Sequence, residues 1–577
     1  MDYKARIARC ICEQGGLDLA PEDLQTWIEQ PPQRELGDYA FPCFRLAKSL
    51  RQAPPAIAQS LLEKVEQNLP QGLSRVEIKG AYLNFFLDRA QSAQELLTQI
   101  LDPNFVPGRG PERGETVLVE YSSPNIAKPF HVGHAFSTVL GEALKRIYGH
   151  LGYEALGLNH LGDYGTQFGK LIAAYKRWGD PEALEREAIP ELLRIYVKFH
   201  EEAEKHPELE DEARDYFRRL EQGEAEEQAL WSLFREASLE EFKRVYKRLG
   251  VCFDNYNGES FYSDKIPAVV ELLRDKGLLE ESEGAQVVRL DDYKMPPCII
   301  LKSDGTTIYA SRDLAAILYR WQTWHFARNI YVVGLPQSLH FKQVFGVLER
   351  AGQACREGCV HVGFGTVKFP KGQGTMSTRS GQVILLEDLL NESVAKTRAI
   401  IRENAANRGQ ELAEEDLEQL AQDIGVSAVQ YAFLRNGRER DIIFTWEDML
   451  DFNGDSAPYL QYSYARARSV LRRAGLDEVE LNQADFSLLT DEESFALLEE
   501  MRGFDKALIQ AAENYEPSIL ARHLQTMARS FSRFYSNCSI LTAEEGEKRA
   551  RLALLAAYCK VLKTGLELLG LRAVERM

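Results

Sequence analysis

Short apolar runs alternate with helix-forming segments between residues 116 and 390, and this alternation restricts the possible folds more than any other feature of the 577-residue chain. The runs TVLVEY (116–121), NIYVVG (329–334) and VHVGFGTVKF (360–369) have the length and composition of buried strands. Strands separated by helices predict an α/β fold, a mostly parallel sheet wrapped by helices. Such sheets bind ligands at the carboxyl ends of their strands, so we expect a ligand site there.

The flanking segments predict two further domains. Residues 1 to about 101 begin with helical patterning, and SRVEIKGAYLNFFLD then alternates apolar and polar residues as a half-buried strand would. Three prolines and three glycines in DPNFVPGRGPERGE (102–115) mark a linker. We predict an N-terminal α/β domain at 1–108, the sheet domain at 109–390 with a helical insertion at about 175–250, and an all-α bundle at 391–577.

Composition limits the class of protein and its compartment. No run reaches the roughly 20 apolar residues that cross a bilayer, and the polar N-terminus lacks a signal-peptide pattern, so we expect a cytoplasmic protein. Nine cysteines without paired spacing indicate reduced thiols. Cys355, Cys359 and His361 could suggest zinc, but a structural zinc site needs four ligands, and the alternative is a surface cysteine followed by a buried strand. We predict no protein-bound metal.

The net charge of −18 argues at first against a nucleic-acid partner. Residues 180–247 carry 20 acidic and 11 basic side chains, which is half of that net charge. Residues 455–577 carry 16 basic and 18 acidic side chains, so this part is nearly neutral and could present a basic face. The acidity therefore does not exclude RNA.

The segment SSPNIAKPFHVGH (122–134) places two histidines where a strand hands over to a helix. If the helix begins near Pro129 to His131, the imidazoles of His131 and His134 project together, because residues three apart share a helix face. They would lie beside the unpaired amides and positive dipole end of the helix, where phosphate binds readily. Gly133 would leave room for a flat base. The alternative for an isolated HxGH is a helix cap plus a core histidine.

Longer strings carry a family resemblance. HVGH after a first strand, with GTMSTRSG (374–381) about 240 residues later, resembles the paired nucleotide-binding signatures of class I aminoacyl-tRNA synthetases. VEYSSPNIAKPFHVGH, NHLGDYGTQFG (159–169), YASRDLAA (309–316) and SAPYLQYSYARARSV (456–470) resemble the arginyl-tRNA synthetases specifically, as do GDYAFPCFRLAK near the start and VERM at the end. The resemblance implies a Rossmann-like catalytic domain, an N-terminal domain that touches the tRNA elbow and a C-terminal anticodon-binding bundle.

The resemblance implies the reaction and its partners. The family activates arginine with ATP to arginyl-adenylate, releases pyrophosphate and transfers arginine to tRNA(Arg), usually as a monomer, with tRNA bound before activation. In-line attack on the α-phosphate needs fixed donors and cations where negative charge develops, a role that His131 and His134 would fit. Magnesium would arrive with ATP and bridge phosphate oxygens rather than occupy a protein cage.

A guanidinium substrate requires the opposite kind of site, with carboxylate and carbonyl acceptors. Asp313 lies four residues after Tyr309, so a helix would place both side chains on one face. The tyrosine ring could then pack on the guanidinium plane while the carboxylate accepts its hydrogen bonds. The alternative is an ordinary helix start in which Asp313 interacts favourably with the helix dipole. The resemblance implies further arginine contacts from Glu120, Ser123, Pro124, Asn125, His134 and Gln337. It places ATP against His131, Gly133, His134 and Ser377.

The chain departs from the class pattern in the second signature. That signature is usually KMSKS, but both lysine positions are threonine here, Thr375 and Thr378, so two cations that steady the triphosphate are missing. The family is thought to compensate with a lysine before HxGH, here Lys128. Arg379, Lys368 and Lys371 are alternatives, and a slow, degenerate enzyme is another. The catalytic residues predicted are His131, His134, Lys128, Met376, Ser377 and Arg379.

Tyrosines and arginines mix in PYLQYSYARARSVLRRAG (458–475), as stacking on unpaired bases and pairing with phosphates require. Arg522, Arg529 and Arg533 could add a second basic stripe. The alternative is that the tyrosines pack the bundle and the arginines are solvated. The tRNA contacts predicted are Tyr459, Gln461, Tyr462, Arg466 and Met577.

Two other functions stay open at this stage. One is a different HxGH nucleotidyltransferase, although such chains are commonly shorter and need no C-terminal RNA module. The other is an RNA-binding paralogue without catalysis, which would bind tRNA and form no adenylate. The intact set His131, His134, Asp313 and Gln337 counts against the second.

Overall fold

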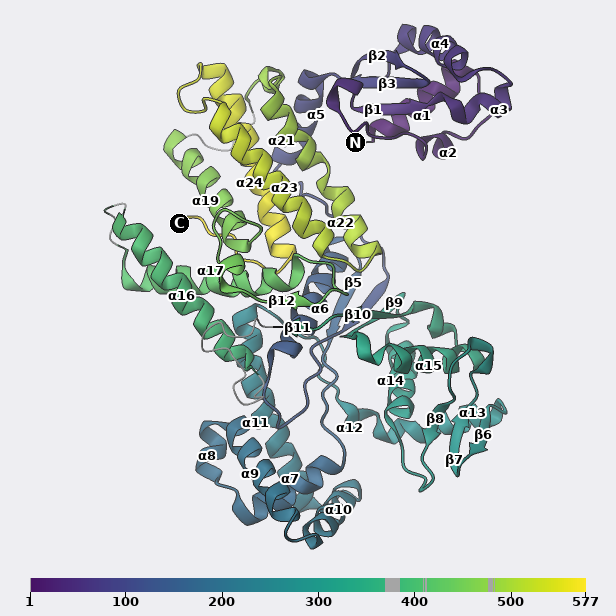
Figure 1. The fold of residues 1–577 in the computed structure, drawn as a ribbon, viewed down its shortest axis with the longest axis vertical. Coiled ribbons are helices and arrows are strands. Elements are labelled where there is room, and N and C mark those ends of the chain that lie inside the picture. Colours follow the sequence, from purple (N-terminus) through teal and green to yellow (C-terminus); the bar gives the residue numbers. More distant parts are fainter. Residues whose placement is uncertain (1, 369–383, 408, 410–411, 476–480, 482) are drawn as a thin grey trace. The chain divides into compact units, whose positions relative to one another are not determined.

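A computed structural model describes residues 2–368, 384–407, 409, 412–475, 481 and 483–577 (Figure 1). The chain forms two compact units. One contains Met1–Phe105, Val470–Arg502 and Arg529–Lys560, and the other contains Val106–Ser469, Gly503–Ala528 and Val561–Met577. Within the described part of the chain, no helix is long and apolar enough to cross a membrane.

The first unit contains a small antiparallel sheet in the order β1-β3-β2. Its strands are β1 (Tyr39–Pro42), β2 (Leu73–Lys79) and β3 (Tyr82–Leu87). The single strand expected over SRVEIKGAYLNFFLD is therefore wrong: this segment is the β2–β3 hairpin. Gly80 has a φ of 64° and lies between the paired residues Lys79 and Tyr82, so it supplies the left-handed backbone of the turn.

Helices cover this sheet and close the core of the first unit. Ile7, Phe41, Leu83, Phe85 and Phe495 belong to one buried cluster. The helices before the linker are α1 (Tyr3–Gly15), α2 (Pro21–Gln25), α3 (Ala47–Leu50), α4 (Pro54–Val65) and α5 (Arg89–Leu101).

The second unit is built on a four-stranded parallel sheet in the order β10-β9-β4-β5. The strands are β4 (Thr116–Glu120), β5 (Glu154–Leu158), β9 (Arg328–Gly334) and β10 (Cys359–Phe364). The predicted parallel α/β fold is confirmed. Strand β5 lies on one side of β4, and the chain then crosses to the other side to form β9. The strand order therefore reverses between β4 and β9. Open α/β sheets bind ligands at such a reversal, beyond the carboxyl ends of the strands.

Three helices pack against this sheet and position the site. They are α6 (Val132–His150), α14 (Tyr309–Trp324) and α15 (Ser338–Arg350). A side chain at Gly141 of α6 would put its Cβ within 2.2 Å of the Tyr121 side chain, so glycine allows α6 to lie directly on the end of β4. Leu118, Leu314, Tyr331 and Phe341 share one buried cluster, which joins the sheet to α14 and α15.

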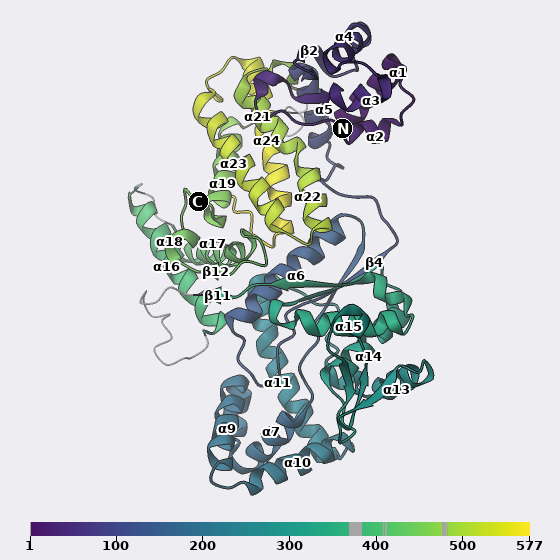
Figure 2. The ribbon, with the colours of Figure 1, turned by 45° about the vertical axis from the view of Figure 1, so that its right-hand side comes forward.

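Two insertions extend the second unit. The first is the predicted helical insertion, and Figure 2 shows α7, α9, α10 and α11 as a group of helices. Its helices are α7 (Thr166–Trp178), α8 (Pro181–Arg186), α9 (Ala188–Ala203), α10 (Glu208–Glu221) and α11 (Ala225–Leu249). The second was not predicted: α12 (Glu259–Tyr262) and α13 (Ile266–Asp275) precede an antiparallel sheet of β6 (Leu279–Ser282), β7 (Ala285–Val288) and β8 (Cys298–Leu301).

The C-terminal part is helical, as its periodicity predicts. Its elements are α16 (Leu386–Asn407), α17 (Glu414–Leu434), α18 (Trp446–Met449), α19 (Ala457–Ala474), α21 (Glu492–Arg502), α22 (Phe504–Glu513), α23 (Ser518–Asn537) and α24 (Glu545–Leu568). One exception is a two-residue parallel pairing of β11 (Val367–Lys368) with β12 (Ile442–Ile443).

Candidate active site

The two histidines of the HVGH motif form the first turn of α6. His131 is the N-cap, and its Nδ1 accepts a hydrogen bond from the Gly133 amide at 3.1 Å. The amide of His131 donates to Nδ1 of His134 at 3.2 Å, so the pair is a reciprocal capping box. The ring centroids lie 3.8 Å apart. A Cβ at position 133 would meet the His131 ring at 2.9 Å, so Gly133 gives room to that ring.

These hydrogen bonds fix the protonation of both rings. Each Nδ1 accepts a backbone amide, so the proton of each neutral imidazole is on Nε2. Burial lowers the pKa of His131, and burial, with the charges of His131 and Lys128, lowers the pKa of His134 to about 3. Near neutral pH the helix start therefore presents two neutral Nε2–H donors, whereas the amides of its first turn are already bonded within the protein.

The turn before α6 has a constrained backbone. Ser122, Ser123 and Ala127 have φ angles of 68°, 45° and 61°, which non-glycine residues rarely adopt. Several bonds hold Ser122: its amide donates to Ser137 Oγ at 3.0 Å, and its hydroxyl lies 2.8 Å from the Tyr246 hydroxyl of α11. Strained backbone conformations that the surrounding structure maintains are common in loops that position side chains for ligand binding.

The next residues of the turn pair with the segment after β5. The Pro124 carbonyl accepts from the Gly162 amide, and the Ile126 amide donates to the Gly162 carbonyl, each at 3.1 Å. A Cβ at Gly162 would lie 2.1 Å from Asn125 Oδ1, so glycine lets the Asn125 side chain lie against this backbone. Asn125 is exposed, Ser123 is half-buried and Pro124 is buried.

Asp313, the predicted guanidinium partner, lies in the first turns of α14, four residues after Tyr309. Its Oδ2 lies 2.5 Å from Nε2 of His340 on α15. Tyr309 is 65% exposed, and the guanidinium of Arg312 lies 5.7 Å from its ring centroid. The structure therefore places Arg312 of the same chain near the ring and His340, which was not predicted, on the carboxylate.

Glu120, at the end of β4, also has a cation partner that was not predicted. Arg320 of α14 is 1% exposed and its Nη2 lies 2.6 Å from Glu120 Oε2. Its Nη1 donates to the Tyr331 hydroxyl at 3.2 Å, and its guanidinium lies between 5.6 and 5.7 Å from the rings of Tyr331 and Tyr262. Tyr331 is the cross-strand neighbour of Glu120 on β9. The Glu120 charge is therefore neutralised within the protein.

A third acidic residue, Glu259 of α12, lies near Asp313. Burial raises its pKa to about 7, and the charges of Asp313 and Asp163 add to this effect, while Arg312 opposes it. Arg312 Nη1 lies 3.5 Å from the Glu259 carboxylate. Sequence analysis missed Glu259, because its segment contains no motif that distinguishes it from an ordinary short helix.

Gln337 ends the turn Leu335–Gln337 after β9 and is exposed. It therefore follows the strand beside β4, on the same edge of the sheet as Glu120 and the HVGH turn. Met376, Ser377 and Arg379, with Thr375, Thr378 and Lys371, lie outside the residues that the structure describes. The carbonyl of Ile384 accepts a hydrogen bond from the Val132 amide at 3.1 Å, so Ile384 lies at the start of α6.

Of the candidates for the missing loop cations, Lys128 and Lys368 lie among the described residues. Lys368 is already paired: its Nζ lies 2.6 Å from Asp441, whose carboxylate also accepts from Thr366 and has a lowered pKa because of these bonds. Lys128 is exposed, and within the described part of the chain its ammonium group has no hydrogen-bond or ion-pair partner. Of these two lysines, the geometry favours Lys128.

The predicted tRNA contacts have different exposures on α19. Tyr459, Tyr462 and Arg466 are half-exposed, as is Met577 at the C-terminus. Gln461 is wrong as a tRNA contact: it is 0% exposed, and its amide donates to the Asp423 and Arg572 carbonyls at 3.2 and 2.8 Å. Tyr464 is also buried and bonds Glu575, whereas Arg472, Arg473, Arg522, Arg529 and Arg533 are exposed.

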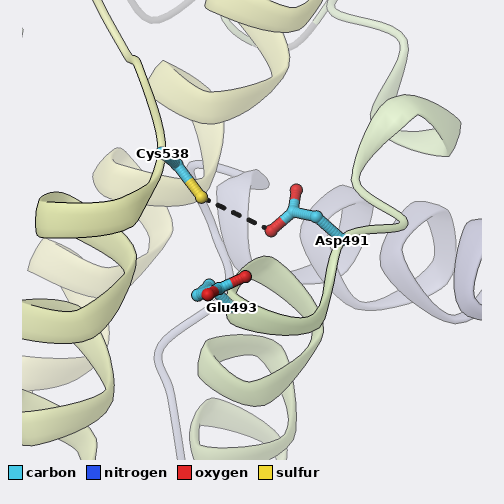
Figure 3. A group of neighbouring side chains, drawn as sticks. All are labelled: Asp491, Glu493 and Cys538. Atoms are coloured by element: carbon cyan, nitrogen blue, oxygen red, sulfur yellow. Dashed lines mark hydrogen bonds between the residues drawn. The ribbon is translucent and has the colours of Figure 1, made fainter.

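Two clusters of possible metal ligands have other roles. Cys355 and Cys359 are both buried, so the expected surface cysteine is wrong; the Cys359 thiol donates to the Cys355 carbonyl, and burial raises both pKa values. Figure 3 shows Cys538 pointing at Asp491 near Glu493. Asp491 caps α21 by accepting a hydrogen bond from the Ser494 amide at 2.8 Å. The pKa of Cys538 is raised to about 12, so its thiol keeps its proton. The role of this cluster is therefore to cap the start of a helix.

Comparison with known proteins covers the whole chain. The family "tRNA synthetases class I (R), catalytic domain" matches residues 97–446, "DALR anticodon binding domain" matches 460–577 and "Arginyl tRNA synthetase N terminal domain" matches 2–87. The arginine–tRNA ligases of Clostridium botulinum (strain Alaska E43 / Type E3) and Clostridium acetobutylicum are each 52% identical over the full length of both chains. The arginyl-tRNA synthetase structure from Thermus thermophilus superposes with a TM-score of 0.80 at 27% identity, covering 100% of this chain and 99% of that one.

Proposed function

The chain belongs to the arginyl-tRNA synthetases, the class I enzymes that ligate arginine to its tRNA for translation, and from this premise we propose which of its groups act in each step. ATP is the co-substrate. We assign the N-terminal domain (1–108) to the tRNA elbow, residues 109–390 to catalysis and residues 391–577 to the anticodon. We also propose a cytoplasmic monomer.

Adenylate formation takes place at the start of α6. An arginine carboxylate oxygen attacks the α-phosphorus, the bond from that phosphorus to the bridging oxygen breaks, and pyrophosphate leaves. Negative charge rises on the phosphate oxygens in the transition state. The Nε2–H groups of His131 and His134, at the positive end of the α6 dipole, are fixed donors that would meet that charge without reorganising. Magnesium, arriving with ATP, would neutralise part of the triphosphate charge.

Arginine is recognised at the neighbouring strand ends. The Asp313 carboxylate accepts hydrogen bonds from the substrate guanidinium, and the Tyr309 ring packs on the guanidinium plane. Ser123, Asn125 and Gln337 bind the other polar groups of the arginine. In the transfer step a ribose hydroxyl at the tRNA 3′ end attacks the arginyl carbonyl, and the bond to AMP breaks. The observation that carries this assignment is that β4 and β9, adjacent in the sheet, lead to the HVGH turn and to Gln337 at one edge.

Aminoacylation with each amino acid and total tRNA tests the assignment of substrate. We expect product with arginine alone, and exchange of pyrophosphate into ATP that depends on arginine. Product with another amino acid only would contradict the proposal.

Lys128 is proposed to replace the missing loop lysines. Lys128→Met should lower kcat/KM for ATP roughly tenfold, the effect of losing one charge-assisted hydrogen bond to phosphate. The matched control is Lys368→Met, since Lys368 is already paired with Asp441. Steady-state pyrophosphate exchange at varied ATP measures both. If the loss occurs in the Lys368 variant instead, Lys128 is not the compensating cation.

Half-exposed residues on α19 are proposed to contact tRNA. Arg466→Ala should weaken tRNA binding and reduce the slope of log affinity against log salt by about 1, because one phosphate contact is lost. Tyr462→Ala should cost about 1–3 kcal/mol of binding if a base stacks on the ring. Filter binding at several salt concentrations measures both. An unchanged slope in the Arg466 variant would rule out its phosphate contact.

A further inference from the structure

The two carboxylates of the predicted arginine pocket are paired with side chains of different kinds. Glu120 and Arg320 are 7% and 1% exposed, and a guanidinium keeps its charge at any physiological pH. Asp313 and His340 have side chains 22% and 24% exposed, and a histidine is charged only when it is protonated. The Glu120 charge is thus always compensated, whereas that of Asp313 is compensated only when His340 is protonated.

We propose that His340 is a positioning residue that acts through Asp313 and couples arginine binding to the release of one proton. The proposal rests on the assignment of Asp313 to the substrate guanidinium. A neutral His340 donates its Nε2–H to Asp313 and leaves the full negative charge for the substrate. A protonated His340 already neutralises Asp313, so an arriving guanidinium would bring a second positive charge to one carboxylate. Arginine therefore binds the deprotonated form more tightly.

Other titratable groups surround the pair. His361 of β10 faces α15, but burial lowers its pKa; Arg438 and Glu439 lie beyond it. Cys298 of β8 has its pKa raised to about 12 by burial and by Asp313. Glu259 could produce the same pH dependence of arginine binding as His340. Its pKa is about 7, so its ionisation adds negative charge near the substrate as the pH rises. The experiment must therefore distinguish the effects of these two residues.

The test measures KM for arginine between about pH 6 and about pH 8.5 in the full-length enzyme. In the unmodified protein KM should fall with rising pH, by at most about tenfold per pH unit for one coupled proton. His340→Gln keeps an N–H donor at the same number of bonds from Cα as Nε2 and has no titrating group, so its KM should vary by no more than about twofold over the range. Glu259→Gln should retain the slope.

His206→Asn is the matched control. His206 also pairs with a carboxylate, Glu208, at 3.2 Å, but on the exposed surface of the helical insertion, so this variant should keep the slope. Calorimetry in buffers of different ionisation enthalpy gives a second readout: arginine binding should release protons in the unmodified enzyme and none in His340→Gln. A slope retained in His340→Gln, or lost in Glu259→Gln alone, overturns the proposal. If Asp313→Asn leaves KM unchanged, the assignment of Asp313 fails instead.

Discussion

Replacement of His134 by asparagine is expected to lower kcat for arginyl-adenylate formation about 10²- to 10³-fold, the usual cost of removing one preorganised donor to a developing oxyanion. The side chain of His134 has two separable tasks. Its Nδ1 accepts the His131 amide and completes the helix cap, and its Nε2–H is proposed to meet the phosphate. The Oδ1 of asparagine lies the same number of bonds from Cα as Nδ1, so His134→Asn keeps the cap and removes only the donor.

His134→Ala removes both tasks and is the matched comparison. It should show a similar loss of kcat and, in addition, a free energy of unfolding lower by about 0.5–2 kcal/mol, because the capping bond is gone. Pyrophosphate exchange at saturating substrates and thermal unfolding measure the two effects. A kcat for His134→Asn within a few fold of the unmodified enzyme would remove His134 from the chemistry and leave it as a cap.

The same histidine makes stability depend on pH in a predictable direction. Its folded-state pKa is about 3, well below the ordinary value of 6.5, because burial disfavours the charged ring. Between these two pKa values the unfolded state binds a proton at His134 that the folded state does not bind. The contribution of His134 to the free energy of unfolding is therefore complete above about pH 6.5 and declines as the pH falls towards 3. The fall of the unfolding midpoint between pH 7 and pH 5 should be smaller in His134→Asn.

The sequence predicted those features that depend on local order along the chain. The strand-to-helix junction at 131–134, the parallel sheet and the helical insertion each have a periodicity or a motif within a few tens of residues. The groups that set the charge of the pocket have no such signal. His340 and Arg320 pair with Asp313 and Glu120 only because α14 and α15 pack beside β4 and β9, across 27 and 200 positions of sequence.

Gln461 shows a different kind of error. It was assigned to tRNA through a motif, although it follows Leu460 and precedes Tyr464 by three positions, which places it on the apolar stripe of a helix. In α19 all three are buried. The helical period alone therefore predicts that Gln461 is buried. Tyr459, Tyr462 and Arg466 lie outside that stripe.

Replacement of Asp313 by asparagine is expected to lower kcat/KM for arginine about 30- to 5,000-fold, mainly through KM, since removing one partner of a desolvated charge pair costs about 2–5 kcal/mol. Because Arg320 already compensates Glu120, Asp313 is the carboxylate whose charge can meet the substrate. The variant should therefore also lose preference for arginine over citrulline, its neutral analogue. Asp292→Asn, in an exposed carboxylate pair with Arg350, is the control and should stay within about twofold. If Asp313→Asn still prefers arginine to citrulline as strongly as before, the selecting charge lies elsewhere, and Glu259 is the next carboxylate to replace.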